Sequence, residues 1–140
     1  MIYDIKAVDL NIAGIPLKDA VVSFEIAPEG PAYADEAGAD GSVCRYATNE
    51  RRANCNVVLK GHSAENAKLS ALLAADVSVS NGLGVVPFLL RDNLGTSLVA
   101  TNKCWIVAMP SATFAQARQD VTWVFRLVLD APLSYVIGGN

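Results

Sequence analysis

The sequence predicts a mainly β protein with one helix that lies on a sheet. Several short segments alternate between apolar and polar residues, as strands with one buried face do. Another segment repeats its leucines at helical spacing. The 140 residues fit one domain, 1–140, and with 52% hydrophobic and 18% charged residues the chain is too apolar to be disordered.

The first strands are expected near the N-terminus. Ile2–Ile12 contains an alternating pattern, and Ala20–Ile26 places its large apolar residues on one face. The segment 27–42 is rich in Gly, Pro, Ala and acids, and it is long for an idle connection. We expect it either to hold an irregular strand near Ala32–Ala34 or to become ordered only against a neighbouring molecule.

A long β-hairpin is expected over residues 42–60, with its turn at Asn49 and Glu50. In the register that this turn sets, Cys44 faces Cys55 across the two strands. One interpretation is a cross-strand disulfide between them. The other is that the three cysteines of the chain are small buried apolar residues, as is usual where a reducing compartment keeps thiols free.

The helix is expected over residues 63–75. Ser63 is a good N-cap, and Glu65 lies in the first turn, where the helix dipole favours an acid. The apolar face that should cover a sheet consists of three leucines, Leu69, Leu72 and Leu73.

Further strands follow the helix, at Val77–Val79, Val85–Arg91 and Ser97–Met109. The clearest strand is Gln119–Asp130, which has one wholly apolar face. Its opposite face also carries Val124 and Val128, whereas a solvated face would be polar. This second face is therefore expected to meet another layer or another subunit.

Catalytic and metal-binding patterns are missing from the sequence, so we expect no enzyme, no cofactor and no metal site. His62 is the single histidine, and neither a Gly-rich phosphate loop nor a nucleophile elbow occurs. The acids Asp35, Glu36 and Asp40 do not have the spacing of a calcium loop. The uncharged stretches are too short to predict a membrane-spanning helix, and the N-terminus has no pattern of a secretory signal.

Charge is unevenly distributed along the chain. Residues 1–40 carry a net charge of −6, whereas residues 41–140 carry +3. This asymmetry favours contacts between copies of the chain over binding of nucleic acid. Arg51 and Arg52, at the expected hairpin tip, form either a solvated turn or a docking finger whose partners are acids such as Asp35 and Glu36.

The order of the segments resembles the tail tube proteins of contractile-tailed bacteriophages. The resemblance spans roughly Asp4 to Asp130, and its most specific part is the Ser-x-x-Asn-x-x-Leu-Ser pattern of Ser63–Ser70. Before it come Gly38–Ser42 and the predicted hairpin, and after it come Lys103–Ile106 and the strand Thr122–Phe125.

This resemblance implies two packed antiparallel sheets, sandwich- or barrel-like, with one flanking helix. It also implies hexameric rings that stack into the inner tail tube, which is assembled in the host cytoplasm and found in the virion. Partners would be other copies of the chain, the sheath, the tape-measure protein, the baseplate hub and the tail terminator, and DNA would pass through without sequence-specific binding. Contacts between subunits would involve residues 44–55 and 27–41. The competing classes are a small ligand-binding β-barrel and a small β-rich enzyme.

Overall fold

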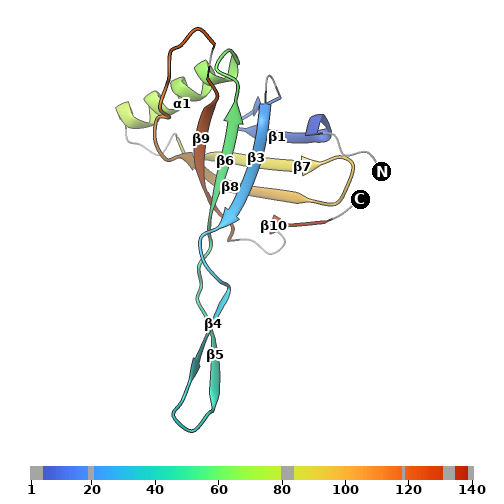
Figure 1. Ribbon diagram of the computed structural model, residues 1–140, viewed down its shortest axis with the longest axis vertical. Coiled ribbons are helices and arrows are strands. Elements are labelled where there is room, and N and C mark those ends of the chain that lie inside the picture. The colour runs from blue at the N-terminus through green and yellow to red at the C-terminus, as the bar shows by residue number, and fades with distance from the viewer. Residues whose placement is uncertain (1–4, 19–20, 80–83, 118, 131–134, 139–140) are drawn as a thin grey trace.

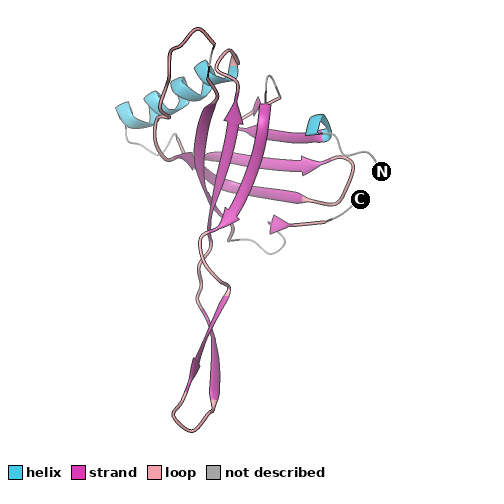
Figure 2. Ribbon diagram, in the orientation of Figure 1, coloured by secondary structure: helices cyan, strands magenta, loops and turns pink. Residues whose placement is uncertain are grey.

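The computed structural model describes residues 5–18, 21–79, 84–117, 119–130 and 135–138. They confirm a mainly β fold with one α-helix and two antiparallel sheets, of which the larger is not closed. The elements, shown in Figures 1 and 2, are a 3-10 turn η1 (Ile5–Ala7), strands β1 (Val8–Ile12), β2 (Ile15–Pro16), β3 (Val21–Pro28), β4 (Tyr33–Ala37), β5 (Val43–Ala47) and β6 (Arg52–Leu59), helix α1 (Glu65–Val79), and strands β7 (Val86–Asp92), β8 (Leu98–Ile106), β9 (Val121–Val128) and β10 (Tyr135–Val136).

The large sheet has the strand order β2-β1-β7-β8-β9-β6-β3, and β10 pairs with β8. Figure 1 shows β1, β7 and β8 running across the direction of β9, β6 and β3. The change of direction falls between β8 and β9, which pair over only Cys104–Ile106. Side chains from both halves form one buried cluster, which includes Leu10 and Phe88 as well as Val57 and Phe125. The core is thus enclosed by two halves of one folded sheet.

Helix α1 covers this core as its leucine pattern predicts. Leu69 and Leu73 are buried, and Leu72 packs against the cluster with part of its surface exposed. The Ser63 hydroxyl accepts a hydrogen bond from the Glu65 amide (3.3 Å), so the predicted cap is confirmed. The Trp123 indole N–H donates to the Asn66 side-chain oxygen (2.9 Å), which ties the helix to β9.

Two boundaries differ from the expected ones. The strand expected at Val77–Val79 is wrong, since α1 continues to Val79. No Gly or Pro separates this short apolar run from the helix, so its own pattern does not choose between the two structures. Near the N-terminus, Ile5–Ala7 forms a 3-10 turn and the strand begins at Val8, while residues 2–4 lie outside the described part of the chain.

The face of β9 that was predicted to be apolar lies in the core, and the opposite face is partly exposed. Trp123, Phe125 and Leu127 are buried in the core. On the opposite face, Val124 and Val128 keep part of their surface exposed. Within the described ranges, no helix combines the length and apolarity needed to span a membrane.

The expected pairing of the 42–60 hairpin is wrong. β5 pairs with β4, and β6 lies between β3 and β9. The chain instead forms one longer hairpin over 21–59, in which β3 pairs with β6 and β4 with β5, and it reverses at Gly38–Ser42. The short second sheet, β4 and β5, projects away from the rest of the molecule (Figure 1).

The proposed Cys44–Cys55 disulfide is excluded by this register, and all three cysteines are free. Cys44 is exposed and stands opposite Glu36 in the projecting sheet. Cys55 is buried in β6, where its neighbours are Ile26 on β3 and Phe125 on β9. The composition of Asn49–Glu50 predicts a turn there, but the chain reverses at Gly38–Ser42 instead. Asn49 does have a positive φ of 58°, but it lies where the projecting sheet joins the body.

Candidate functional site: the projecting arm

The arm, defined here as residues 31–48, comprises β4, β5 and the reversal between them, and nearly all of its residues are exposed (Figure 2). Every residue of β5 is exposed, and among the described strands none outside the arm pairs with β4 or β5. Large apolar side chains nevertheless lie on it, with Val43 70%, Tyr33 53% and Tyr46 51% exposed. A two-stranded hairpin without a core is marginally stable in water, so this surface is suited to burial against a partner.

Charged and apolar residues share the two faces of the arm. On one face Tyr33, Asp35 and Ala37 stand opposite Ala47, Arg45 and Val43, respectively. The Arg45 guanidinium carbon lies 4.2 Å from the centre of the Tyr33 ring, a cation–π contact that stiffens this face. On the other face Ala34 stands opposite Tyr46, and Glu36 opposite Cys44.

The reversal at the tip is a compact turn built on Asp40. One Asp40 carboxylate oxygen accepts hydrogen bonds from the Ser42 amide (3.0 Å) and the Ser42 hydroxyl (2.7 Å). These bonds lower the pKa of Asp40, so the carboxylate stays charged at neutral pH. Gly41 has a φ of +87°, which favours glycine. The distal arm therefore presents a fixed negative charge.

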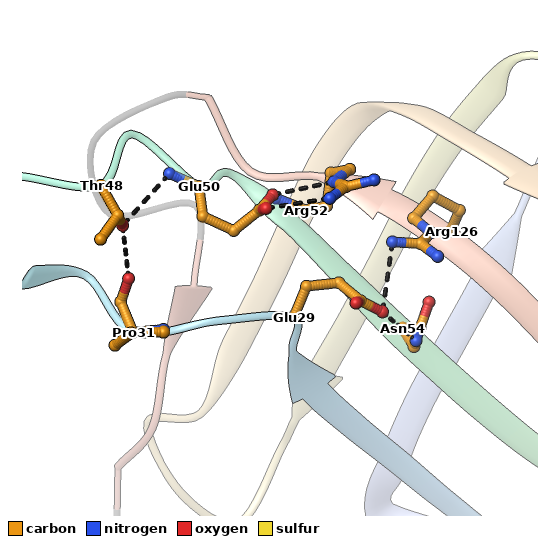
Figure 3. Close-up of polar contacts among 7 residues, drawn as sticks. All are labelled: Glu29, Pro31, Thr48, Glu50, Arg52, Asn54 and Arg126. Carbon is orange, nitrogen blue, oxygen red and sulfur yellow. Dashed lines mark hydrogen bonds and ion pairs between the residues drawn. The ribbon is translucent and has the colours of Figure 1, made fainter. Parts of the chain in front are cut away.

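Arg51 and Arg52 lie at the base of the arm, not at its tip. The guanidinium of Arg52 binds the Glu50 carboxylate through two hydrogen bonds, of 2.9 and 3.0 Å (Figure 3). The pairing lowers the pKa of Glu50 to about 2. The acids Asp35 and Glu36 lie in β4, well outside this base. The structure thus does not bring the predicted arginines and acids together within one chain.

A second polar cluster at the base joins the arm to the sheet (Figure 3). The Glu29 carboxylate accepts a hydrogen bond from the Asn54 amide nitrogen and lies 3.2 Å from the Arg126 guanidinium. Nearby, the Thr48 hydroxyl donates to the carbonyl of Pro31, and the Thr48 amide donates to that of Ala32 (3.1 Å). Sequence reasoning missed Glu29 as a member of this cluster, because its partners come from distant strands.

The exposed aromatic residues of the arm, Tyr33 and Tyr46, fall within the ranges 27–41 and 44–55 expected to make contacts, although the sequence did not single them out. The signal was present in Gly38–Ser42, which has the composition of a tight reversal, and in the alternation from Tyr33 to Ala37. The candidates Val124 and Val128 lie on β9 in the body, so the predicted contact residues are divided between the arm, its base and the sheet.

A cavity and two buried cysteine thiols lie outside the arm. A cavity of about 420 Å³ is lined by Val8, Leu17, Val21 and Phe24, with Lys6 and Lys18 beside them. Among the described residues, no three His, Cys, Asp or Glu side chains are placed to hold a metal ion. Burial raises the pKa of the Cys55 thiol to about 12 and also raises that of Cys104, so neither is an activated nucleophile.

A scan against models of known protein families matched none of them, and a comparison with curated protein sequences found no similar protein.

Proposed function

We propose that the chain is a structural subunit that assembles with copies of itself through its arm, and that the assembly is the inner tail tube of a contractile-tailed bacteriophage. The observation that carries self-assembly is the arm, which exposes Tyr33, Val43 and Tyr46 on a hairpin without a core. A contact between the arm of one copy and a different surface of the next is heterologous, and such contacts generate rings or filaments.

Two features outside the arm support the proposed self-assembly. On the outer face of β9, Val124 and Val128 keep part of their apolar surface exposed on either side of Arg126. Large exposed side chains also occur in the segment after β8, where Phe114 is 92% and Met109 56% exposed. These surfaces are candidates for the subunit contacts of a hexameric ring and of stacked rings.

The tail tube assignment itself rests on the resemblance of Ser63–Ser70 and the neighbouring segments. It makes the virion the expected location, with the sheath, tape-measure protein, baseplate hub and tail terminator as partners. The protein is not expected to be an enzyme, and DNA would pass through the tube without specific recognition.

The test compares purified wild-type protein with a Val43→Ser, Tyr46→Ser double variant by sedimentation velocity and negative-stain microscopy. Wild type should form rings or tubes as its concentration rises, and the variant should remain small. The matched control is Val85→Ser with Leu94→Ser, which changes body residues of similar exposure. Wild-type protein that remains monomeric at about millimolar concentration would contradict the proposal.

A small ligand-binding protein is the second candidate, and the 420 Å³ cavity between β1 and β3 favours it. Its apolar walls fit the hydrocarbon chain of an amphiphile such as a fatty acid. The test measures binding of a fluorescent fatty acid to protein that stays monomeric. If Phe24→Trp weakens this binding because the larger side chain fills the cavity, the result would favour this function over the tube.

A further inference from the structure

Each of the two legs of the arm is tied at its base to β9, a strand outside the hairpin. On the returning leg, the Leu129 amide just after β9 donates to the Arg51 carbonyl (2.8 Å). On the outgoing leg, the Glu29 carboxylate contacts Asn54 of β6 and Arg126 of β9. Figure 3 shows the Glu29 side chain directed at both partners. The side chain of Glu29 thus links three neighbouring strands of the sheet at the point where the arm begins.

The segment where the arm joins the large sheet needs such a link, because the pairing of its two strands is irregular. Regular β3–β6 pairing ends at Pro28 and Ala53, and β4–β5 pairing starts at Tyr33 and Ala47. Between these pairs the two legs are of unequal length, and the returning leg contains Asn49 with its positive φ. A two-stranded ribbon joined through an irregular segment can pivot unless side chains hold it.

The Glu29–Arg126 pair is better shielded from water than other ion pairs of the described chain. Its side chains are 28% and 21% exposed, whereas those of Lys103 and Asp130 are 57% and 48% exposed. Shielding strengthens the attraction and makes the loss of one partner costly, because the other charge is left without its counterpart. The Glu29 amide also donates to the Arg52 carbonyl (3.0 Å), which fixes the backbone beneath the carboxylate.

We propose that Glu29, Asn54 and Arg126 form a clasp that fixes the direction of the arm relative to the sheet, with Glu29 as the positioning residue. Its importance for assembly rests on the proposed function, since an arm that points in one direction docks without the entropic cost of ordering. The clasp itself is a property of the single chain and is measured there.

The experiment tests whether the arm keeps one direction in unassembled protein, by measuring a distance between two nitroxides with pulsed electron–electron double resonance. One nitroxide is placed on Cys44, which is exposed on the arm while Cys55 and Cys104 are buried. The second is placed on the body at Lys68→Cys, an exposed position of α1. Glu29→Gln removes the negative charge of the clasp. Glu25→Gln, at an exposed position of β3 before Glu29, is the matched control for charge.

Wild type and Glu25→Gln should give one narrow distance distribution, and Glu29→Gln should broaden it by at least about twofold. Arg126→Gln should broaden it similarly, and the exchanged pair Glu29→Arg with Arg126→Glu should narrow it again. Circular dichroism and melting curves verify that each variant is folded. If folded Glu29→Gln retains the wild-type width, the proposal is overturned.

An assembly assay separates this inference from the function on which its meaning rests. Glu29→Gln should assemble more slowly than Glu25→Gln. If the distance distribution broadens while assembly proceeds as in wild type, the clasp holds the arm as proposed, and it is the role of the arm in assembly that fails.

Discussion

Glu36 and Cys44 stand directly opposite each other across the two strands of the arm, and both side chains are exposed to solvent. This pairing separates Cys44 from Cys55, which is fully buried between Ile26 and Phe125 in the large sheet. The arm and the core are therefore chemically distinct environments, and the cysteines report on them independently.

Cysteine alkylation should distinguish these environments. Iodoacetamide at pH 8 should modify Cys44 quickly in folded protein and modify Cys55 and Cys104 only after unfolding, since burial raises the pKa of the Cys55 thiol to about 12. Peptide mass spectrometry of timed samples gives the three rates. Comparable rates at Cys44 and Cys55 would show that β6 is not packed between β3 and β9.

The Glu50–Arg52 pair predicts a dependence of stability on pH. Because the pKa of Glu50 is lowered from 4.5 to about 2, its contribution to folding is present above pH 4.5 and disappears as the pH falls towards 2. Arg52→Gln should therefore lower the melting temperature near neutral pH and match wild type near pH 2. Side-chain NMR titration should find the pKa of Glu50 raised in the variant. An unchanged pKa would mean that the pair does not form in solution.

The packing of α1 is tested at Leu69, which is fully buried. Leu69→Ala should lower the free energy of unfolding by about 2–5 kcal/mol, because it removes apolar contacts and leaves a cavity. Lys68→Ala, an exposed neighbour on the same helix, should change it by less than about 0.5 kcal/mol. Urea denaturation measures both values, and equal midpoints would contradict the observed contact between helix and sheet.

Charges at the two ends of the arm should affect assembly more than folding. Arg51→Glu with Arg52→Glu should slow tube formation, because exposed pairs between copies are each worth roughly 0.5–1 kcal/mol and recur around a ring. Adding Asp35→Lys and Glu36→Lys should partly restore the rate if the arginines meet these acids on a neighbouring copy. Light scattering at low and high salt measures the effect. If the variant with Arg51→Glu and Arg52→Glu assembles at the wild-type rate, the two arginines do not contribute to assembly and act only at the base of the arm.

Several elements were predictable from local sequence because the local signals agree with the tertiary packing. The 63–75 helix has a cap and an apolar face, and both are confirmed, although the helix extends to Val79. Gln119–Asp130 has one apolar face, and β9 occupies Val121–Val128 with Trp123, Phe125 and Leu127 of that face buried. In both cases, the periodicity that defines the element is the one that fills the core.

The candidate site was predictable only in part. Of the two alternatives for the segment 27–42, the structure has the strand, as β4 at Tyr33–Ala37. The contact candidates Asp35 and Glu36 lie on the arm, and Arg51 and Arg52 lie at its base. The positions of the two arginines relative to the tip depend on which of two possible turns is used. Asn49–Glu50 and Gly38–Ser42 both have the composition of a reversal.

Local sequence patterns are sufficient to predict a mainly β protein, one amphipathic helix after the middle strands, and an apolar face on β9. The pairing of the hairpin, in contrast, depends on tertiary contacts. Alternate residues of β6, from Ala53 to Leu59, are fully buried when β6 pairs with β3 on one side and β9 on the other. That burial involves strands far apart in the chain, and its free energy outweighs the preference of a local turn at Asn49. The same long-range pairing leaves β4 and β5 paired with each other alone among the described strands, and so creates the arm.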